Sequence, residues 1–165
     1  MPTNNIEILH KEIDIIQNCI NRMASNSFLI KGWFITLILG FITFGYDKLN
    51  FIILIIISLI ITILCWISDA FFLQLERKYR EKYTWVITNR NSSLDFLYNL
   101  NPNENGMWNS NSPTKIKFFN VFFSKTLRFL YGTILLMLII TLFISLYSLH
   151  KDSIQTTYFN VFIIQ

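Results

Sequence analysis

Residues 28–72 read FLIKGWFITLILGFITFGYDKLNFIILIIISLIITILCWISDAFF, and this stretch decides the fold. Its first apolar run, Phe28 to Tyr46, contains a single charge, Lys31, and its second, Leu49 to Ile67, contains none. At about 1.5 Å per residue each run measures ~28 Å as a helix, which matches the ~30 Å hydrocarbon core of a bilayer. The connection at 47–50 has room only for a turn. The stretch therefore predicts a transmembrane helical hairpin.

The whole chain is apolar and basic. Its 165 residues are 53% hydrophobic, and its mean hydropathy is +0.44. A soluble domain is about 45–50% apolar even when glycine is counted, so a soluble chain of this length has no room to bury such runs. The net charge of +4 comes from basic residues beside apolar runs, which is typical of topology and headgroup signals. Cys19 and Cys65 fit no disulfide framework or zinc spacing.

A third apolar run, residues 129–149, is again long enough to cross a bilayer. We expect the helix of the second run to continue past Asp69 and through residues 84–100, because no glycine or proline interrupts it before Asn89. The sequence therefore predicts an all-α membrane protein. Its expected parts are an amphipathic helix (1–27), the transmembrane hairpin (28–68), a cytoplasmic helical segment (69–128) with a turn-rich loop (101–114), a third transmembrane helix (129–149) and a tail with weak strand-like character (150–165).

The N-terminal helix carries an apolar seam whose spacings alternate between three and four residues, as in a heptad repeat. The seam consists of Ile6, Leu9, Ile13, Ile16, Ile20 and Met23. Two interpretations are open: the helix packs on its own chain or lies on the membrane, or it packs against copies of itself. The seam is shorter than the three to four heptads that indicate a coiled coil, so it does not decide between them.

Small and weakly polar residues form a stripe on one face of each hairpin helix. The stripes are Thr36, Gly40 and Thr43 in the first run, and Ser58, Thr62, Cys65 and Asp69 in the second. Such residues let helices approach closely in lipid, and they also suit the lining of a pore. Packing is the more common use, and both interpretations remain open.

Asp69 stands between apolar residues at the end of the second run. A carboxylate in that setting is costly unless it is paired, hydrated or at the membrane edge. Three environments are therefore open: a hydrated position at the membrane edge, the mouth of a pore, or a pair with Lys31 or Arg22 of the first helix.

Basic and aromatic residues alternate just before the third run, which suits a helix that enters the membrane interface. The expected interfacial residues are Lys115, Lys117, Lys125 and Arg128 here, with Lys31 and Trp33 at the start of the first run. The same composition suits RNA binding by base stacking, but direct attachment to an apolar run favours the membrane. The excess of Lys and Arg before the first run and between the second and third predicts a cytoplasmic N-terminus and an external C-terminus.

The sequence contains no pattern typical of catalysis, metal binding or cofactor binding. It has no glycine-rich phosphate loop, no cluster of metal ligands and no Ser-His-Asp pattern. The two histidines, His10 and His150, lie at opposite ends of the chain. We therefore expect no enzyme, no cofactor and no metal.

Two blocks of sequence resemble a family of small bacterial membrane proteins of anti-phage defence. They are RMASNSF (22–28) with KGW (31–33), and DAFFL (69–73) with LERKYR (75–80). The nearest family is the membrane accessory protein of type VI-B CRISPR systems, and two-helix SLATT-type effectors are a looser comparison. The resemblance covers residues 5–85. It implies a homo-oligomeric pore that depolarises the bacterial inner membrane when an RNA-guided or nucleotide-signalling partner triggers it. The type VI-B family is linked to an Arg–His motif of the HEPN type, whose spacing is absent here, so no RNase role follows.

Three functions are consistent with the sequence. The first is a homo-oligomeric pore-forming effector, for which the hairpin, the stripes and the resemblance speak. The second is a non-conducting membrane anchor or scaffold that recruits a soluble partner to the inner leaflet. The third, a membrane protein that binds RNA through residues 115–128, is the least favoured, so membrane lipid is the expected partner of that segment.

Overall fold

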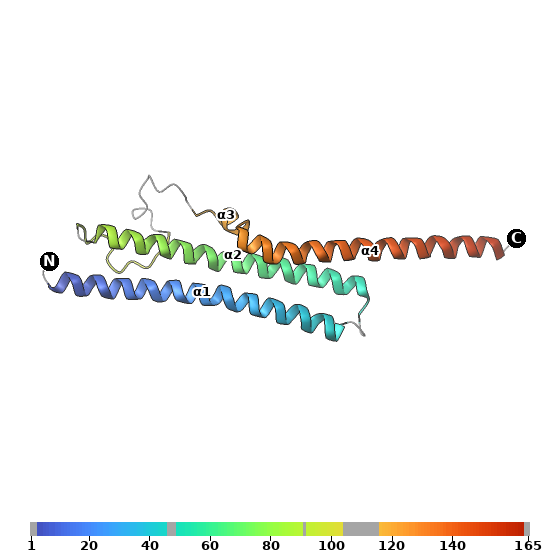
Figure 1. Ribbon diagram of the computed structural model, residues 1–165, viewed down its shortest axis with the longest axis horizontal. Helices are drawn as coiled ribbons and strands as arrows, with labels where there is room; N and C mark the ends of the chain where they lie inside the picture. Colours follow the sequence, from blue (N-terminus) through green and yellow to red (C-terminus); the bar gives the residue numbers. More distant parts are fainter. Residues whose placement is uncertain (1–2, 46–48, 91, 104–115, 164–165) are drawn as a thin grey trace.

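The computed structural model describes residues 3–45, 49–90, 92–103 and 116–163. Every regular element in these ranges is an α-helix, which confirms the all-helical prediction. The helices are α1 (Thr3–Gly45), α2 (Phe51–Asn89), α3 (Phe118–Phe122) and α4 (Lys125–Ile163). Figure 1 shows an elongated molecule in which α1 and α2 lie side by side and α4 runs along part of α2.

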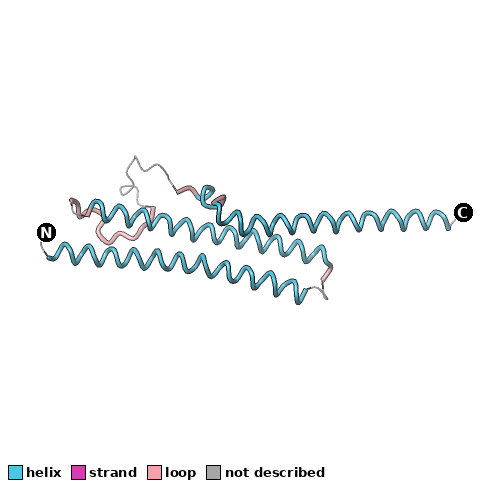
Figure 2. The backbone as a smooth tube through the Cα atoms, in the orientation of Figure 1, coloured by secondary structure: helices cyan, strands magenta, loops and turns pink. Residues whose placement is uncertain are grey.

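The hairpin of α1 and α2 has an apolar end and a polar end. The apolar end comprises residues 28–45 and 51–68, and the polar end comprises residues 3–27 and 69–89. Each helix passes from one end to the other without a break, so the expected boundaries at 27/28 and 68/69 fall inside continuous helices (Figure 2).

Gly45 and Asn50 shape the end of α1 and the start of α2, where the two helices meet. A Cβ added at Gly45 would lie 3.0 Å from Leu54 Cδ1, so glycine allows α1 to approach α2 closely at this point. Asn50 caps α2, because its side chain accepts a hydrogen bond from the Ile52 backbone N–H at 3.1 Å.

The helical prediction for residues 84–100 is wrong beyond Asn89, where α2 ends. Residues 92–103 form a loop that folds back along the polar end (Figure 1). The sequence there is rich in Asn, Ser and Asp, whose side chains compete for backbone hydrogen bonds and favour turns. The Ser93 hydroxyl, for example, accepts from the Asp95 backbone N–H at 3.0 Å. Most of the expected loop at 101–114 lies outside the described residues.

The strand-like prediction for the tail is wrong as well. α4 continues as a helix to Ile163, past the level at which α1 ends and α2 begins (Figure 1). No glycine or proline follows Gly132 in this helix, and extending an existing helix is favourable where no breaker intervenes.

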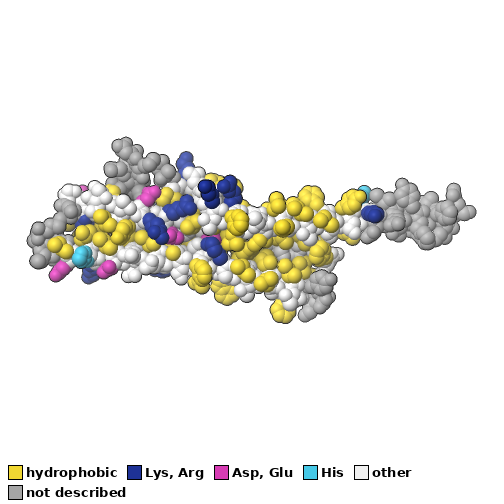
Figure 3. All heavy atoms as spheres, viewed as in Figure 1, with side chains coloured by type: hydrophobic (Ala, Val, Ile, Leu, Met, Phe, Trp, Pro, Cys, Tyr) yellow, Lys and Arg dark blue, Asp and Glu magenta, His cyan; other side chains and the backbone are white. Residues whose placement is uncertain are grey.

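Among the residues that the structure describes, three helices are long and apolar enough to cross a membrane: Ile6–Gly45, Phe51–Asn89 and Lys125–Lys151. Large apolar side chains are exposed along all three, as at Phe44 and Phe129, which are both 78% exposed. In Figure 3 hydrophobic side chains cover the apolar end of the hairpin and the adjoining part of α4, whereas charged side chains gather over the rest. A continuous apolar surface of this kind suits a lipid environment.

Candidate functional site

Asp69 lies on α2 at the junction of the polar and apolar ends, and its side chain is fully buried. Lys31 of α1 pairs with it, at 2.7 Å from Nζ to Oδ2 and 2.8 Å from Nζ to Oδ1. Ser27, one turn before Lys31, donates its hydroxyl hydrogen to Oδ1. Tyr131 of α4 donates to Oδ2 at 3.1 Å. We call Ser27, Lys31, Asp69 and Tyr131 the Asp69 cluster.

The Asp69 cluster satisfies the conditions that a buried ion pair needs. Removing two charges from water is expensive, and their attraction offsets this cost only with good geometry and further hydrogen bonds. Here the carboxylate accepts from three side chains, and Lys31 also donates to the Ser27 hydroxyl at 2.8 Å. Of the environments open for Asp69, the structure contains the pair with Lys31. Asp69 is fully buried inside the described part of the chain.

Aromatic packing holds Tyr131 in place. Its ring lies 5.0 Å from that of Phe34 on α1 and 6.0 Å from that of Trp66 on α2, measured between centroids. Trp66 also stacks on Phe122 of α3 at 4.4 Å and donates its indole N–H to the Phe122 carbonyl at 3.0 Å. The site therefore joins α1, α2 and α4 directly, and α3 through Trp66.

The second stripe faces the interior of the chain. Ser58 and Thr62 are fully buried, and Cys65 packs against the cluster that contains Trp66. The hydroxyls of Ser58 and Thr62 donate to carbonyls one turn back in α2, at 2.9 and 2.8 Å. Together with Asp69 they form a buried polar row along α2.

The first stripe faces outward. Thr36 and Thr43 are exposed, and their hydroxyls donate to the Gly32 and Leu39 carbonyls of the same helix at 3.0 and 2.8 Å. Nothing lies within 4 Å of a Cβ added at Gly40. The two stripes are therefore not in contact, and only the second contributes to packing within the chain.

The apolar seam of the N-terminal helix packs on α2 of the same chain. Ile16 and Ile20 form a buried cluster with Val86, with Leu9 and Ile13 at its edge. Met23 is buried too, whereas Ile6 is exposed. This corresponds to the first of the two interpretations of the seam. Most of the seam is covered within the chain, and its role as a contact between copies stays a prediction.

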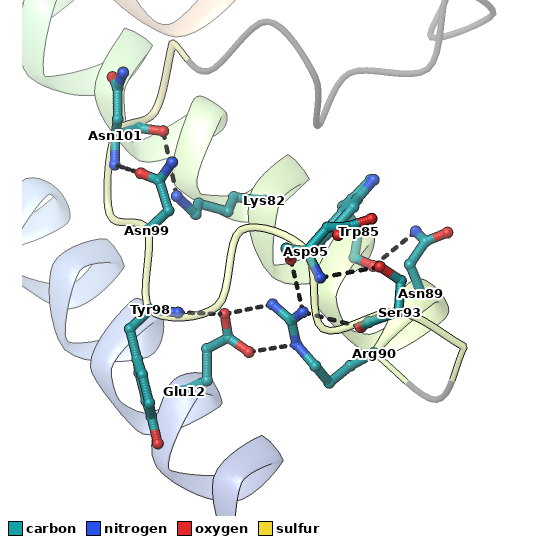
Figure 4. Close-up of polar contacts among 10 residues, drawn as sticks. All are labelled: Glu12, Lys82, Trp85, Asn89, Arg90, Ser93, Asp95, Tyr98, Asn99 and Asn101. Atoms are coloured by element: carbon teal, nitrogen blue, oxygen red, sulfur yellow. Dashed lines mark hydrogen bonds and ion pairs between the residues drawn. The ribbon is translucent and has the colours of Figure 1, made fainter. Parts of the chain in front are cut away.

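A second buried polar cluster lies at the polar end (Figure 4). Glu12 of α1 and Arg90 form a bidentate pair, with Nε to Oε2 and Nη2 to Oε1 both at 2.7 Å. Arg90 also donates to the carbonyls of Ser93 and Asp95 at 3.1 and 2.8 Å. Glu12 accepts from the Tyr98 backbone N–H at 3.2 Å. We call this group the Glu12–Arg90 clasp.

The clasp holds the 92–103 loop in a costly backbone conformation. Phe96 and Tyr98 adopt positive φ angles of 58° and 54°. A non-glycine residue in this region costs about 1–3 kcal/mol and persists only when its surroundings enforce it. The clasp supplies that enforcement, and Trp85 adds to it, because its ring centroid lies 5.7 Å from Arg90 Cζ.

Sequence reasoning missed the clasp, although one signal pointed to it. Glu12 is three residues after Leu9 and four before Ile16, so it lies on the apolar face of its helix. A charge on that face needs a buried partner. Tyr131 was missed too, and the sequence offers no comparable signal, because nothing local indicates that its hydroxyl reaches a residue far away in the chain.

The residues expected at the membrane interface differ in their exposure. Trp33, Lys117, Lys125 and Arg128 are exposed. Lys31 is engaged with Asp69, with its side chain 25% exposed. Lys115 lies outside the described residues. Among the described residues no group of three or more His, Cys, Asp or Glu is placed to hold a metal ion.

Fold and site define an all-helical protein with three helices of membrane-spanning length and a buried charge pair between them. The chain matches no protein-family model, no curated protein and no solved structure.

Proposed function

We propose that the chain is a multi-pass protein of the bacterial inner membrane. Its polar end and N-terminus lie in the cytoplasm, and its C-terminus lies outside. The positive-inside rule supports this orientation, because Lys and Arg concentrate before the first span and between the second and third. No catalytic role is proposed.

Within that membrane we propose a homo-oligomeric, pore-forming effector of anti-phage, CRISPR-associated defence, which depolarises the membrane when triggered. The observation that carries the proposal is the buried polar row of Ser58, Thr62 and Asp69. Polar and ionisable residues inside spans are expensive, and they often mark pathways for ions or protons. The row is covered in the resting chain, with Asp69 neutralised by Lys31.

Opening then requires the Asp69 cluster to separate, so that the row lines a pathway between copies. The outward stripe of Thr36, Gly40 and Thr43 is the proposed contact between copies, because small residues allow helices to approach closely in lipid. An RNA-guided or nucleotide-signalling partner, as the resemblance implies, is the proposed trigger. It would act on the polar end, whose helices continue directly into the spans.

Single-channel recording in a planar bilayer tests this proposal, with each variant made in a chain that also carries Asp69→Asn and should therefore conduct without the trigger. Thr62→Val keeps the shape of the side chain and removes its hydroxyl, so unitary conductance should fall. Thr133→Val, the same change at an exposed position of α4, should leave it unchanged. Equal conductance in the two variants would remove the polar row from the pathway.

A non-conducting anchor is the second candidate, and the 92–103 loop favours it. The loop exposes Leu94, Tyr98 and Leu100 at the polar end, where a soluble partner can reach them. Leu94→Ser should then abolish recruitment of a co-expressed partner to membranes that remain sealed to ions. Recruitment that survives this change would count against the anchor.

A further inference from the structure

The short helix α3 and the first turn of α4 form a corner at the level of Trp66. Phe122 and the fully buried Val121 hold the inner side of this corner against the molecule. Its outer side carries alternating cations and phenylalanines. These outer residues, which we call the α3–α4 corner, are Lys117, Phe119, Phe123, Lys125, Arg128 and Phe129.

The cations of the corner are uncompensated within the part of the chain that the structure describes. Lys117, Lys125 and Arg128 are exposed, and none of them forms a hydrogen bond or ion pair there through its side chain. The sequence adds that residues 105–151 contain no Asp or Glu. Arg80 of α2, by contrast, is exposed but forms an ion pair with Glu76 at 2.7 Å. The corner is thus a local concentration of positive charge with no anionic partner among the described residues.

The phenylalanines indicate where that anion lies. Phe119 and Phe129 are 72% and 78% exposed, and Phe123 is exposed beside them. Exposed aromatic rings beside cations suit the headgroup region of a bilayer, where the rings enter the acyl boundary and the cations meet phosphates. The corner also stands at the end of the apolar surface, because α4 enters its apolar segment immediately after Arg128 (Figure 3).

We propose that the α3–α4 corner binds the phosphate headgroups of anionic phospholipids in the leaflet that faces the polar end. This goes beyond the pore, and it holds whether or not the protein conducts. Charge complementarity carries it: three uncompensated cations, no acidic neighbour in the surrounding sequence, and rings placed to enter the same leaflet. RNA also carries phosphates, but RNA binding would not explain why the phenylalanines lie beside the start of an apolar helix of membrane-spanning length.

Native mass spectrometry of the full chain from nanodiscs tests the site. The discs contain phosphatidylcholine with or without phosphatidylglycerol, and the readout is the lipid retained on the protein. The wild type should retain phosphatidylglycerol in preference to phosphatidylcholine, and more weakly at high salt. The double variant Lys125→Gln with Arg128→Gln should lose about 10- to 30-fold of that preference, since each basic residue near an anionic surface contributes a several-fold effect.

The control is Lys11→Gln with Lys151→Gln, which removes the same charge from two exposed positions away from the corner and should keep the preference. Equal retention of both lipids by the wild type would overturn the proposal. The proposal would also be overturned if the control variant lost the preference for phosphatidylglycerol as strongly as the double variant does. A third result would also overturn the proposal. If the wild type shows no lipid preference, and lipid-free protein binds a single-stranded RNA that the double variant does not bind, the corner is a nucleic-acid site.

Discussion

Tyr131 donates its hydroxyl hydrogen to Asp69 at 3.1 Å, across 62 residues of sequence. This bond attaches α4 to the hairpin at the same carboxylate that pairs with Lys31 of α1. Asp69, which belongs to α2, therefore contacts both of the other long helices, α1 and α4. Changes at Asp69 should act on the whole arrangement of the three long helices, whereas changes at its partners should act on one helix at a time.

Asp69→Asn should destabilise the folded chain by about 1–3 kcal/mol. Breaking a fully buried ion pair costs about 3–5 kcal/mol because it leaves a charge without its partner. Lys31 is partly exposed, so it can turn towards solvent or headgroups and recover part of that cost. Thermal unfolding in detergent measures the change. Asp14→Asn, at an exposed position of α1, is the matched control, and an equal shift in both variants would contradict the role of the pair.

Tyr131→Phe should loosen α4 alone. The change removes the hydroxyl that donates to the Asp69 carboxylate and keeps the ring that packs on Phe34 and Trp66, so the expected loss is about 1.5–3 kcal/mol, as for a hydrogen bond to a charged group. Spin labels on α2 and α4 should report a broader distance distribution, while a label pair on α1 and α2 stays unchanged. Tyr147→Phe, at an exposed ring, should change neither. Broadening in both label pairs would mean that Tyr131 supports more than α4.

Arg90→Ala should open the polar end. It leaves Glu12 buried without its partner, so the expected local cost is about 3–5 kcal/mol. Hydrogen exchange should speed up in the 92–103 loop and in the facing part of α1, and barely change in residues 51–68. Arg80→Ala removes the pair of the exposed Arg80 with Glu76 one turn away in α2, for which about 0.3–0.5 kcal/mol is expected. A loop equally protected in both variants would show that the clasp does not hold it.

Ile16→Ala should destabilise the chain by about 2–4 kcal/mol without changing its oligomeric mass. Ile16 is fully buried against Val86 of the same chain, and truncating a buried isoleucine leaves a cavity. Ile6→Ala, at the exposed end of the seam, should have little effect on stability. Unfolding curves and native mass together make the test. A loss of mass without a loss of stability would return the seam to the role of a contact between copies.

The sequence could predict what depends on local composition. Hydropathy alone located the three described helices that are long and apolar enough to cross a membrane, because a long apolar run has few other stable environments. The pair of Asp69 with Lys31 was among the expected environments, since both residues lie at the same end of the hairpin and a buried carboxylate needs a partner. The contacts of Tyr131 depend on long-range packing that no local pattern contains, and the position of Glu12 indicates only that it needs a buried partner, not that the partner is Arg90.

The errors have physical causes as well. Residues 92–103 form a loop because their Asn, Ser and Asp side chains favour turns, and Arg90, which follows the end of α2, pairs with Glu12 of α1. The tail is helical because α4 propagates through it, although its last residues carry β-branched and aromatic side chains.

The most direct test of the pore proposal is the current through a planar bilayer that holds purified chain of known oligomeric mass. If the Asp69 cluster keeps the polar row closed, a discrete oligomer of Asp69→Asn should conduct without a trigger, and Asp14→Asn should stay as silent as the resting wild type. A chain that remains a single copy, with Asp69→Asn as silent as the control, would contradict the pore.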